Sequence, residues 1–145
     1  MVIPRQVYNE LSQINYLKSK IDTMISSNYL DIEDIDIGSE EGQLYLKLTK
    51  NHISPNRPLI GKGEAAGIVL AKRDSGILAS NNLKDISYYV KEYGLSHITT
   101  SEILKQAFDD SFISETEANN IWEKMIKKKR MLPFSTFTDY LKSLI

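Results

Sequence analysis

The residue types that are absent or rare in this chain exclude several kinds of catalytic or metal-binding site. The sequence contains no cysteine, which rules out a disulfide scaffold, a thiolate metal site and a cysteine nucleophile. Its two histidines, His52 and His97, are too few for a histidine-built zinc site unless acidic residues complete it. Any metal site would therefore depend on carboxylates.

Two short segments could bind phosphate groups: the glycine-containing residues 61–63 and the basic residues 127–130. Gly61-Lys62-Gly63 is not a phosphate-binding P-loop, because no strand precedes it and no Gly-Lys-Ser/Thr follows. The basic run Lys127, Lys128, Lys129 and Arg130 ends a predicted helix. It could contact an RNA backbone, or it could be a solvated helix end, where cations are favourable in any case. Both interpretations stay open from the sequence.

Length, composition and charge indicate the class of protein. The chain has 145 residues, of which 41% are apolar and 26% charged, as in a globular domain. The formal net charge is −1, so no global cationic field exists and any nucleic-acid contact must be local. No apolar run approaches the roughly 20 residues of a membrane span. We expect a soluble, cytoplasmic protein with no membrane partner.

The elements that must position these side chains follow from hydrophobic periodicity and helix-capping signals. Apolar spacing predicts a helix over residues 7–25, and short apolar runs at 30–37, 76–79 and 97–98 indicate strands. Helices are predicted after Ser39, over 63–72, and over 83–93 before Gly94. Thr99 with Glu102, and Ser114 with Glu117, have capping-box spacing and open two more helices. Residues 134–144 form a C-terminal amphipathic turn or helix.

The alternation of strands and helices predicts an α/β fold with a parallel sheet and right-handed crossovers. We interpret residues 1–145 as one domain with a central sheet flanked by helices in three layers. Its C-terminal part, from about residue 99 to 145, is expected to be helical.

Several stretches of the chain are similar, in their order and spacing, to the motifs of one known protein family. Ile3-Pro4-Arg5-Gln6-Val7-Tyr8-Asn9-Glu10-Leu11 resembles the family's "IP-x-x-V-x-x-E-L" segment. Gly63-Glu64-Ala65-Ala66-Gly67-Ile68-Val69-Leu70-Ala71 resembles its "G-E-A-x-A-I-x-L-A" helix, and residues 76–85 its next strand and turn. Residues 113–133 are similar to the C-terminal helices of VapC-like members. Together these stretches resemble the PIN-domain family, which includes VapC-like toxin ribonucleases, and the resemblance covers most of the chain in the same order.

The resemblance implies a three-layer PIN-like sandwich and a metal-dependent ribonuclease site built from about four carboxylates. Hard cations such as Mg²⁺ or Mn²⁺ prefer oxygen ligands and can activate water beside a phosphate. The family's acids fall on Glu10 and Glu64, but the acids that end the next strand fall on the neutral Asn81 and Asn82. Asp85, about one helical turn further on, is a possible substitute.

The carried-over site therefore has catalytic candidates Glu10, Glu64, Asn81, Asn82 and Asp85, with Glu10, Glu64 and Asn82 as metal ligands. The family's first acid lies on an opening strand ahead of the "IP" segment. We expect that strand to be missing here, which would expose sheet edges that a homo-oligomer could cover.

Two functions remain after this comparison with the family. The first is a Mg²⁺- or Mn²⁺-dependent endoribonuclease of the toxin–antitoxin type that cleaves single-stranded RNA, with residues 127–130 guiding the RNA backbone. The second is a catalytically inactive PIN-like module that binds RNA or a protein partner such as an antitoxin. The neutral amide pair would lower cation affinity and favours the second.

Overall fold

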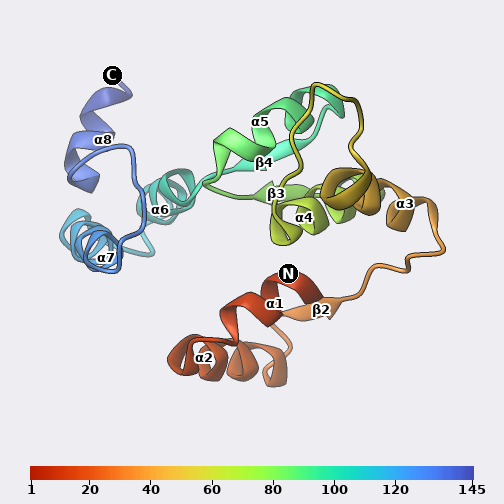
Figure 1. The fold of residues 1–145 in the computed structure, drawn as a ribbon. Helices are drawn as coiled ribbons and strands as arrows, with labels where there is room; N and C mark the ends of the chain where they lie inside the picture. The colour runs from red at the N-terminus through yellow and green to blue at the C-terminus, as the bar shows by residue number, and fades with distance from the viewer. The chain divides into compact units, whose positions relative to one another are not determined.

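The computed structural model describes residues 1–145, whose internal contacts form two compact units (Figure 1). Unit 1 contains Met1–Leu78 and Asn82–Ser96, and unit 2 contains Ala79–Asn81 and His97–Ile145. The helical C-terminal part expected from about residue 99 lies within unit 2. No helix is both long enough and apolar enough to cross a membrane.

The N-terminal part of unit 1 consists of strand β1 (Val2–Pro4), helices α1 (Arg5–Leu11) and α2 (Asn15–Ser26), and strand β2 (Asp31–Glu33). Strand β1 pairs in parallel with β2, with Ile3 opposite Ile32. Ile3, Ile21 and Leu30 are buried together between these elements. Strand β1 contains the "IP" segment itself, so the expectation that the strand ahead of this segment is missing stays a prediction.

The predicted helix over residues 7–25 is wrong as a single element, because the chain turns between α1 and α2. The backbone N–H groups of Gln13 and Ile14 donate three residues back, to Glu10 and Leu11. These tighter hydrogen bonds end the first helix, and α2 then starts in a new direction. The turn lets Ile21 of α2 join Ile3 in one core.

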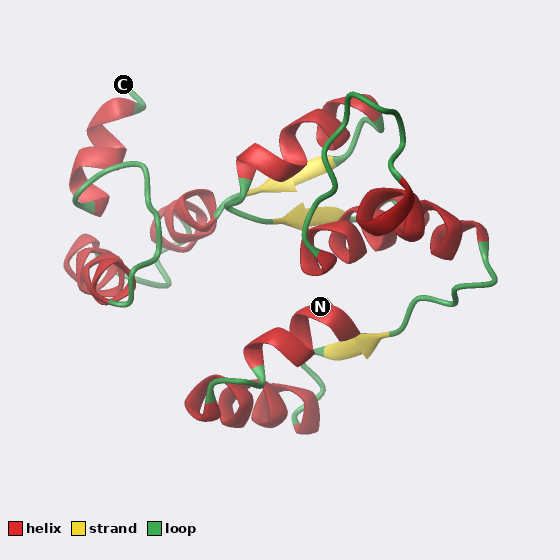
Figure 2. Ribbon diagram, viewed as in Figure 1, coloured by secondary structure: helices red, strands yellow, loops and turns green.

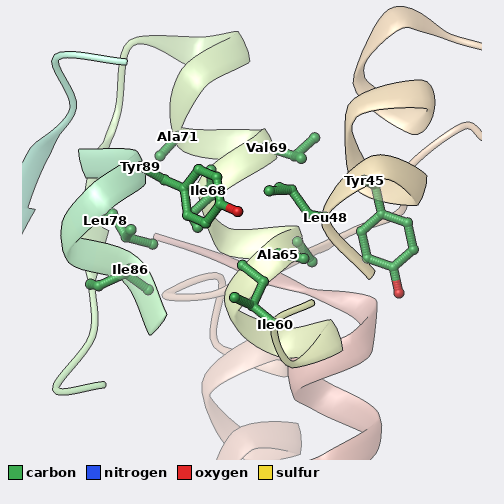
Figure 3. Packing of buried hydrophobic residues seen from close by; sticks show 11 residues of the cluster. Tyr45, Leu48, Ile60, Ala65, Ile68, Val69, Ala71, Leu78, Ile86 and Tyr89 are labelled. Atoms are coloured by element: carbon green, nitrogen blue, oxygen red, sulfur yellow. The ribbon is translucent and has the colours of Figure 1, made fainter. Parts of the chain in front are cut away.

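The remainder of unit 1 is built around one small-residue helix. Its elements are α3 (Glu40–Leu46), the π-helical turn η1 (Lys47–Asn51), α4 (Lys62–Asp74), β3 (Ile77–Ala79) and α5 (Leu83–Glu92). Ser39 caps α3 as predicted, since its hydroxyl accepts from the Gly42 N–H at 3.1 Å. Figure 3 shows Ala65, Ile68 and Val69 of α4 among the buried side chains of this core. Alanine and glycine on α4 allow neighbouring elements to approach its backbone closely.

The parallel strands are present, but they form two separate pairs. Strand β3 pairs with β4 (Ser96–Ile98), and no strand of the first pair joins the second (Figure 2). The α/β class with small parallel sheets flanked by helices is confirmed. The expected single central sheet is divided between these two pairs of strands.

Unit 2 has an aromatic core held by three helices, α6 (Thr100–Asp109), α7 (Glu115–Lys127) and α8 (Phe137–Ser143). Trp122 and Phe137 are completely buried, and the Trp122 ring stacks on Tyr140 with centroids 5.8 Å apart. Both predicted capping boxes are confirmed, at the starts of α6 and α7.

Candidate functional site

Glu64 lies in the first turn of α4, where the helix begins without a side-chain cap. The N-cap residue is Gly61, and the Glu64 carboxylate folds back over it. A Cβ atom placed on Gly61 would lie only 2.3 Å from Glu64 Oε2. Glycine at this position therefore leaves room for the carboxylate at the positive end of the helix dipole.

Asn82 connects Glu64 to Asp85 through one amide group. Its Nδ2 donates to Glu64 Oε1 and to Asp85 Oδ2, each at 3.0 Å. An amide NH₂ has two hydrogens, so it can serve both carboxylates at once. All three side chains are half-buried. We call Glu64, Asn82 and Asp85 the acid–amide cluster, in which a neutral donor lies between two negative groups that would otherwise repel each other.

Glu10 approaches the same end of α4 from helix α1. A Cβ atom placed on Gly63 would lie 3.3 Å and 3.4 Å from the two carboxylate oxygens of Glu10, and 3.2 Å from Val7 Cγ2. A larger residue at position 63 would require these side chains to shift by a few tenths of an ångström. The Glu10 carboxylate is exposed and lies against the residue that precedes Glu64. Glu64, Asn82 and Asp85 are therefore joined by hydrogen bonds, and Glu10 lies against Gly63 beside the start of α4.

Asn81 is engaged elsewhere, although it is adjacent to Asn82 in the chain. Its Nδ2 donates to the Thr100 hydroxyl at 3.0 Å, and its Oδ1 accepts from the Thr100 backbone N–H at 2.9 Å. Both ends of the carboxamide thus stabilise the start of α6. The structure does not bring Asn81 into the acid–amide cluster, and its predicted catalytic role gains no support.

The basic run at the end of α7 is fully exposed. Lys127 forms an ion pair with Glu123 at 2.7 Å. Lys128 is the C-cap residue, and the next residue, Lys129, has a left-handed backbone with φ +58°. The Arg130 backbone N–H donates to the Met125 carbonyl oxygen at 3.0 Å. This geometry accounts for the run as a helix end, and its four cations also remain accessible to an anionic ligand.

The residues do not fit Mg²⁺ or Mn²⁺ in the arrangement that the structure shows. Oxygen ligands suit these ions, but the Nδ2 atom of Asn82, rather than its oxygen, faces both carboxylates. Nowhere in the chain do three or more His, Cys, Asp or Glu side chains gather in a way that could hold a metal ion. A cation ligated by Glu10, Glu64 and Asn82 would require the Asn82 carboxamide to turn over.

A cavity of about 600 Å³ beside Glu10 contains residues that the sequence analysis missed. It is lined by Gln6, Asn9, Glu10, Gln13, Tyr45 and Lys62. Burial raises the pKa of the Tyr45 phenol, a hydrogen bond with Gln6 opposes this change, and the charge of Glu10 adds to it. The signal was a pair of carboxamides, Gln6 and Asn9, whose spacing of three places them on one face of α1, with Gln13 in the turn that follows.

Comparisons of the chain with protein-family models, with curated proteins and with solved structures found no match. The likeness to PIN-domain proteins rests on the motifs in the sequence.

Proposed function

We propose that this chain is a PIN-like module that binds single-stranded RNA without cleaving it. The PIN-like fold is part of this proposal, and the two small parallel strand pairs flanked by helices are compatible with it. The observation that carries the proposal is the Asn82 amide between Glu64 and Asp85, at 3.0 Å from each. The amide relieves the repulsion between two carboxylates, which in a metal-dependent nuclease is the task of the cation.

RNA is the proposed ligand for two reasons. The family resemblance points to single-stranded RNA, and the basic run of residues 127–130 exposes cations that can neutralise phosphates locally. Because the net charge is −1, this contact would depend on a few residues and would weaken steeply as the salt concentration rises.

The second candidate is the metal-dependent endoribonuclease. The observation in its favour is that the carboxylates of Glu64 on α4 and Asp85 on α5 accept from the same Asn82 amide group. Glu10 of α1 lies nearby in the fold, against Gly63 in the first turn of α4. When bound, a divalent cation would neutralise the scissile phosphate and lower the pKa of a water molecule. The chain's own contribution would be to hold the carboxylates of Glu64 and Asp85 close enough together to contact the same cation.

The test measures binding and cleavage of a labelled single-stranded RNA in the same samples, with and without Mn²⁺. We expect the wild-type chain to bind the RNA and to leave it intact. Metal-dependent cleavage that Glu64→Gln abolishes and Glu40→Gln preserves would establish the nuclease instead. Glu40 is a matched control, because it also lies in the first turn of a helix, α3, outside the cluster. Failure to bind RNA would overturn the proposal.

A second variant, Asn82→Asp, tests the role of the amide directly. It replaces the bridging donor with a third carboxylate beside Glu64 and Asp85. We expect Mn²⁺ to raise the melting temperature of Asn82→Asp and to leave that of the wild type unchanged. Equal stabilisation of both proteins by Mn²⁺ would show that the amide does not keep the cation out.

A further inference from the structure

The cavity beside Glu10 is an open depression whose accessible surface is more apolar than polar, and its lining residues carry both hydrogen-bond donors and acceptors. Gln6 and Tyr45 are its more buried residues, and Asn9, Glu10, Gln13 and Lys62 are exposed around it. The Oε1 atom of Gln6 is buried and has no hydrogen-bond partner. The Nε2 atom of Gln13 already donates to the Asn9 carbonyl oxygen at 3.3 Å.

The Glu10 carboxylate is the strongest of these acceptors. It forms no ion pair, although Lys62 lines the same cavity. Its two oxygens lie side by side against Gly63, the residue that follows Lys62. A ligand that matches these two side chains would present two adjacent hydrogen-bond donors to the Glu10 carboxylate and an acceptor to the Lys62 ammonium group.

We propose that this cavity binds a guanine base. Among the four RNA bases, only guanine has two adjacent donors on its Watson–Crick edge, N1–H and the N2 amino group, next to the acceptor O6. The donors would pair with the two oxygens of Glu10, and O6 would accept from Lys62 Nζ. Single-stranded RNA presents these edges to proteins, so the inference rests on the proposed function and adds a base preference to it.

The size of the cavity and the position of Lys62 support this choice. A volume of about 600 Å³ is in the range of small-molecule sites and admits a base with part of its ribose. An arginine side chain from a protein partner also presents two adjacent donors to a carboxylate. The positive charge of Lys62 disfavours a guanidinium group and favours the oxygen of guanine.

The first test uses uncharged nucleosides, so that phosphate binding elsewhere does not contribute. Isothermal titration calorimetry would compare guanosine, inosine and adenosine on the full chain. Inosine lacks only the N2 amino group, and a hydrogen bond to a carboxylate is worth about a tenfold change in affinity or more. We expect guanosine to bind at least about tenfold more tightly than inosine, and adenosine more weakly still. Equal binding of the three nucleosides, or tighter binding of an arginine peptide, would overturn the inference.

Variants locate the effect in the protein. Glu10→Gln should weaken guanosine binding by about tenfold or more, because the neutral carboxamide offers one acceptor in place of two. Glu40→Gln, a change of the same chemistry outside the cavity, should leave the affinity unchanged. Equal affinities of wild type and Glu10→Gln would place guanosine elsewhere and overturn the inference.

Oligonucleotides separate RNA from a free guanine nucleotide as the source of the base, and they separate the two proposals. A single-stranded RNA with one guanine should bind more tightly than both guanosine and the same RNA with adenine in its place. RNA binding without any guanine preference would reject the guanine cavity and keep the RNA-binding function. Guanosine binding without RNA binding would reject that function and keep the cavity, with a free nucleotide as its ligand.

Discussion

Helix α4 of unit 1 and helices α6 and α7 of unit 2 use a glutamate in the first turn in opposite ways. In unit 2, Glu102 and Glu117 accept from the backbone N–H groups of Thr99 at 2.7 Å and Ser114 at 2.8 Å. Each carboxylate is used by its own helix start. In unit 1, Glu64 accepts instead from Asn82, which lies outside its helix.

The difference comes from the N-cap residue. Thr99 and Ser114 supply hydroxyl groups that complete a capping box, whereas Gly61 has no side chain to offer. A first-turn glutamate that closes a capping box is explained by helix stability alone. Glu64 is not explained in this way, and its partner on another helix marks it as a candidate functional residue.

The cores of the two units differ as well. Unit 2 relies on large aromatic side chains, and unit 1 relies on aliphatic residues with close approach of backbones. Unit 2 should therefore be most sensitive to the loss of an aromatic side chain, and unit 1 to an added methyl group at a close backbone approach.

The largest effect is expected for Trp122→Ala in the aromatic core. Trp122 is completely buried, and its Nε1 donates to the Phe134 carbonyl oxygen at 2.9 Å. Removal of the indole should lower the free energy of unfolding by about 3–5 kcal/mol, as measured by denaturant titration. Tyr29→Ala, at a side chain that is 71% exposed, should change it by less than about 0.5 kcal/mol. In Trp122→Ala, amide hydrogen exchange should accelerate mainly in unit 2. Equal acceleration in both units would show that the two cores do not unfold independently.

A smaller effect is expected for Gly42→Ala in unit 1. A Cβ atom at this position would lie 2.2 Å from the Asp36 carbonyl oxygen and 2.4 Å from the Ile37 Cα atom. Backbone atoms cannot move aside cheaply, so the melting temperature should fall, with a cost of about 1–3 kcal/mol. The control is Gly38→Ala, whose Cβ would meet its nearest neighbour at 3.4 Å. Equal melting temperatures for the two variants would contradict the close approach.

The smallest effect is expected for the capping boxes, and it depends on pH. Hydrogen bonds from Thr99 hold the pKa of Glu102 below its ordinary value of 4.5, and those from Ser114 do the same for Glu117. A carboxyl group with a lowered pKa in the folded state stabilises the fold at pH above 4.5. The stabilisation is lost as the pH falls through the folded-state pKa.

Thr99→Ala should therefore cost about 1 kcal/mol at neutral pH and less under acidic conditions. Denaturant titrations at several pH values would show whether the free energies of unfolding of Thr99→Ala and wild type become more similar as the pH falls. Thr116→Ala, at an exposed position inside α7, should show no such pH dependence. A constant difference between Thr99→Ala and wild type at every pH would argue against the capping carboxylate.

The features that the sequence predicted correctly are mostly local. The capping boxes at Thr99 and Ser114 and the Ser39 cap depend on residues three positions apart, so spacing is enough to find them. The meeting of Glu64 with Asn82 is not local, and in the sequence only the resemblance to PIN-domain motifs grouped these two residues.

The features that were missed depend on distant contacts or on unmarked turns. The break between α1 and α2 has no proline or glycine at residues 12–14 to signal it. Asn81 and Asn82 have the same chemistry, and only the three-dimensional structure assigns Asn81 to Thr100, nineteen residues away. The division of the strands into two pairs likewise depends on tertiary packing, which periodicity does not report.

Position 63 has a hydrogen atom where any other residue would place a carbon, and this controls how closely α1 can approach α4. Alanine there would meet both oxygens of Glu10 within 3.4 Å and would push that carboxylate outward by a few tenths of an ångström. The added methyl group of Gly63→Ala neither removes nor adds a titratable group. It would nonetheless weaken the negative potential that Glu10 and Glu64 create together, so a single methyl group could tune which ligands this surface attracts.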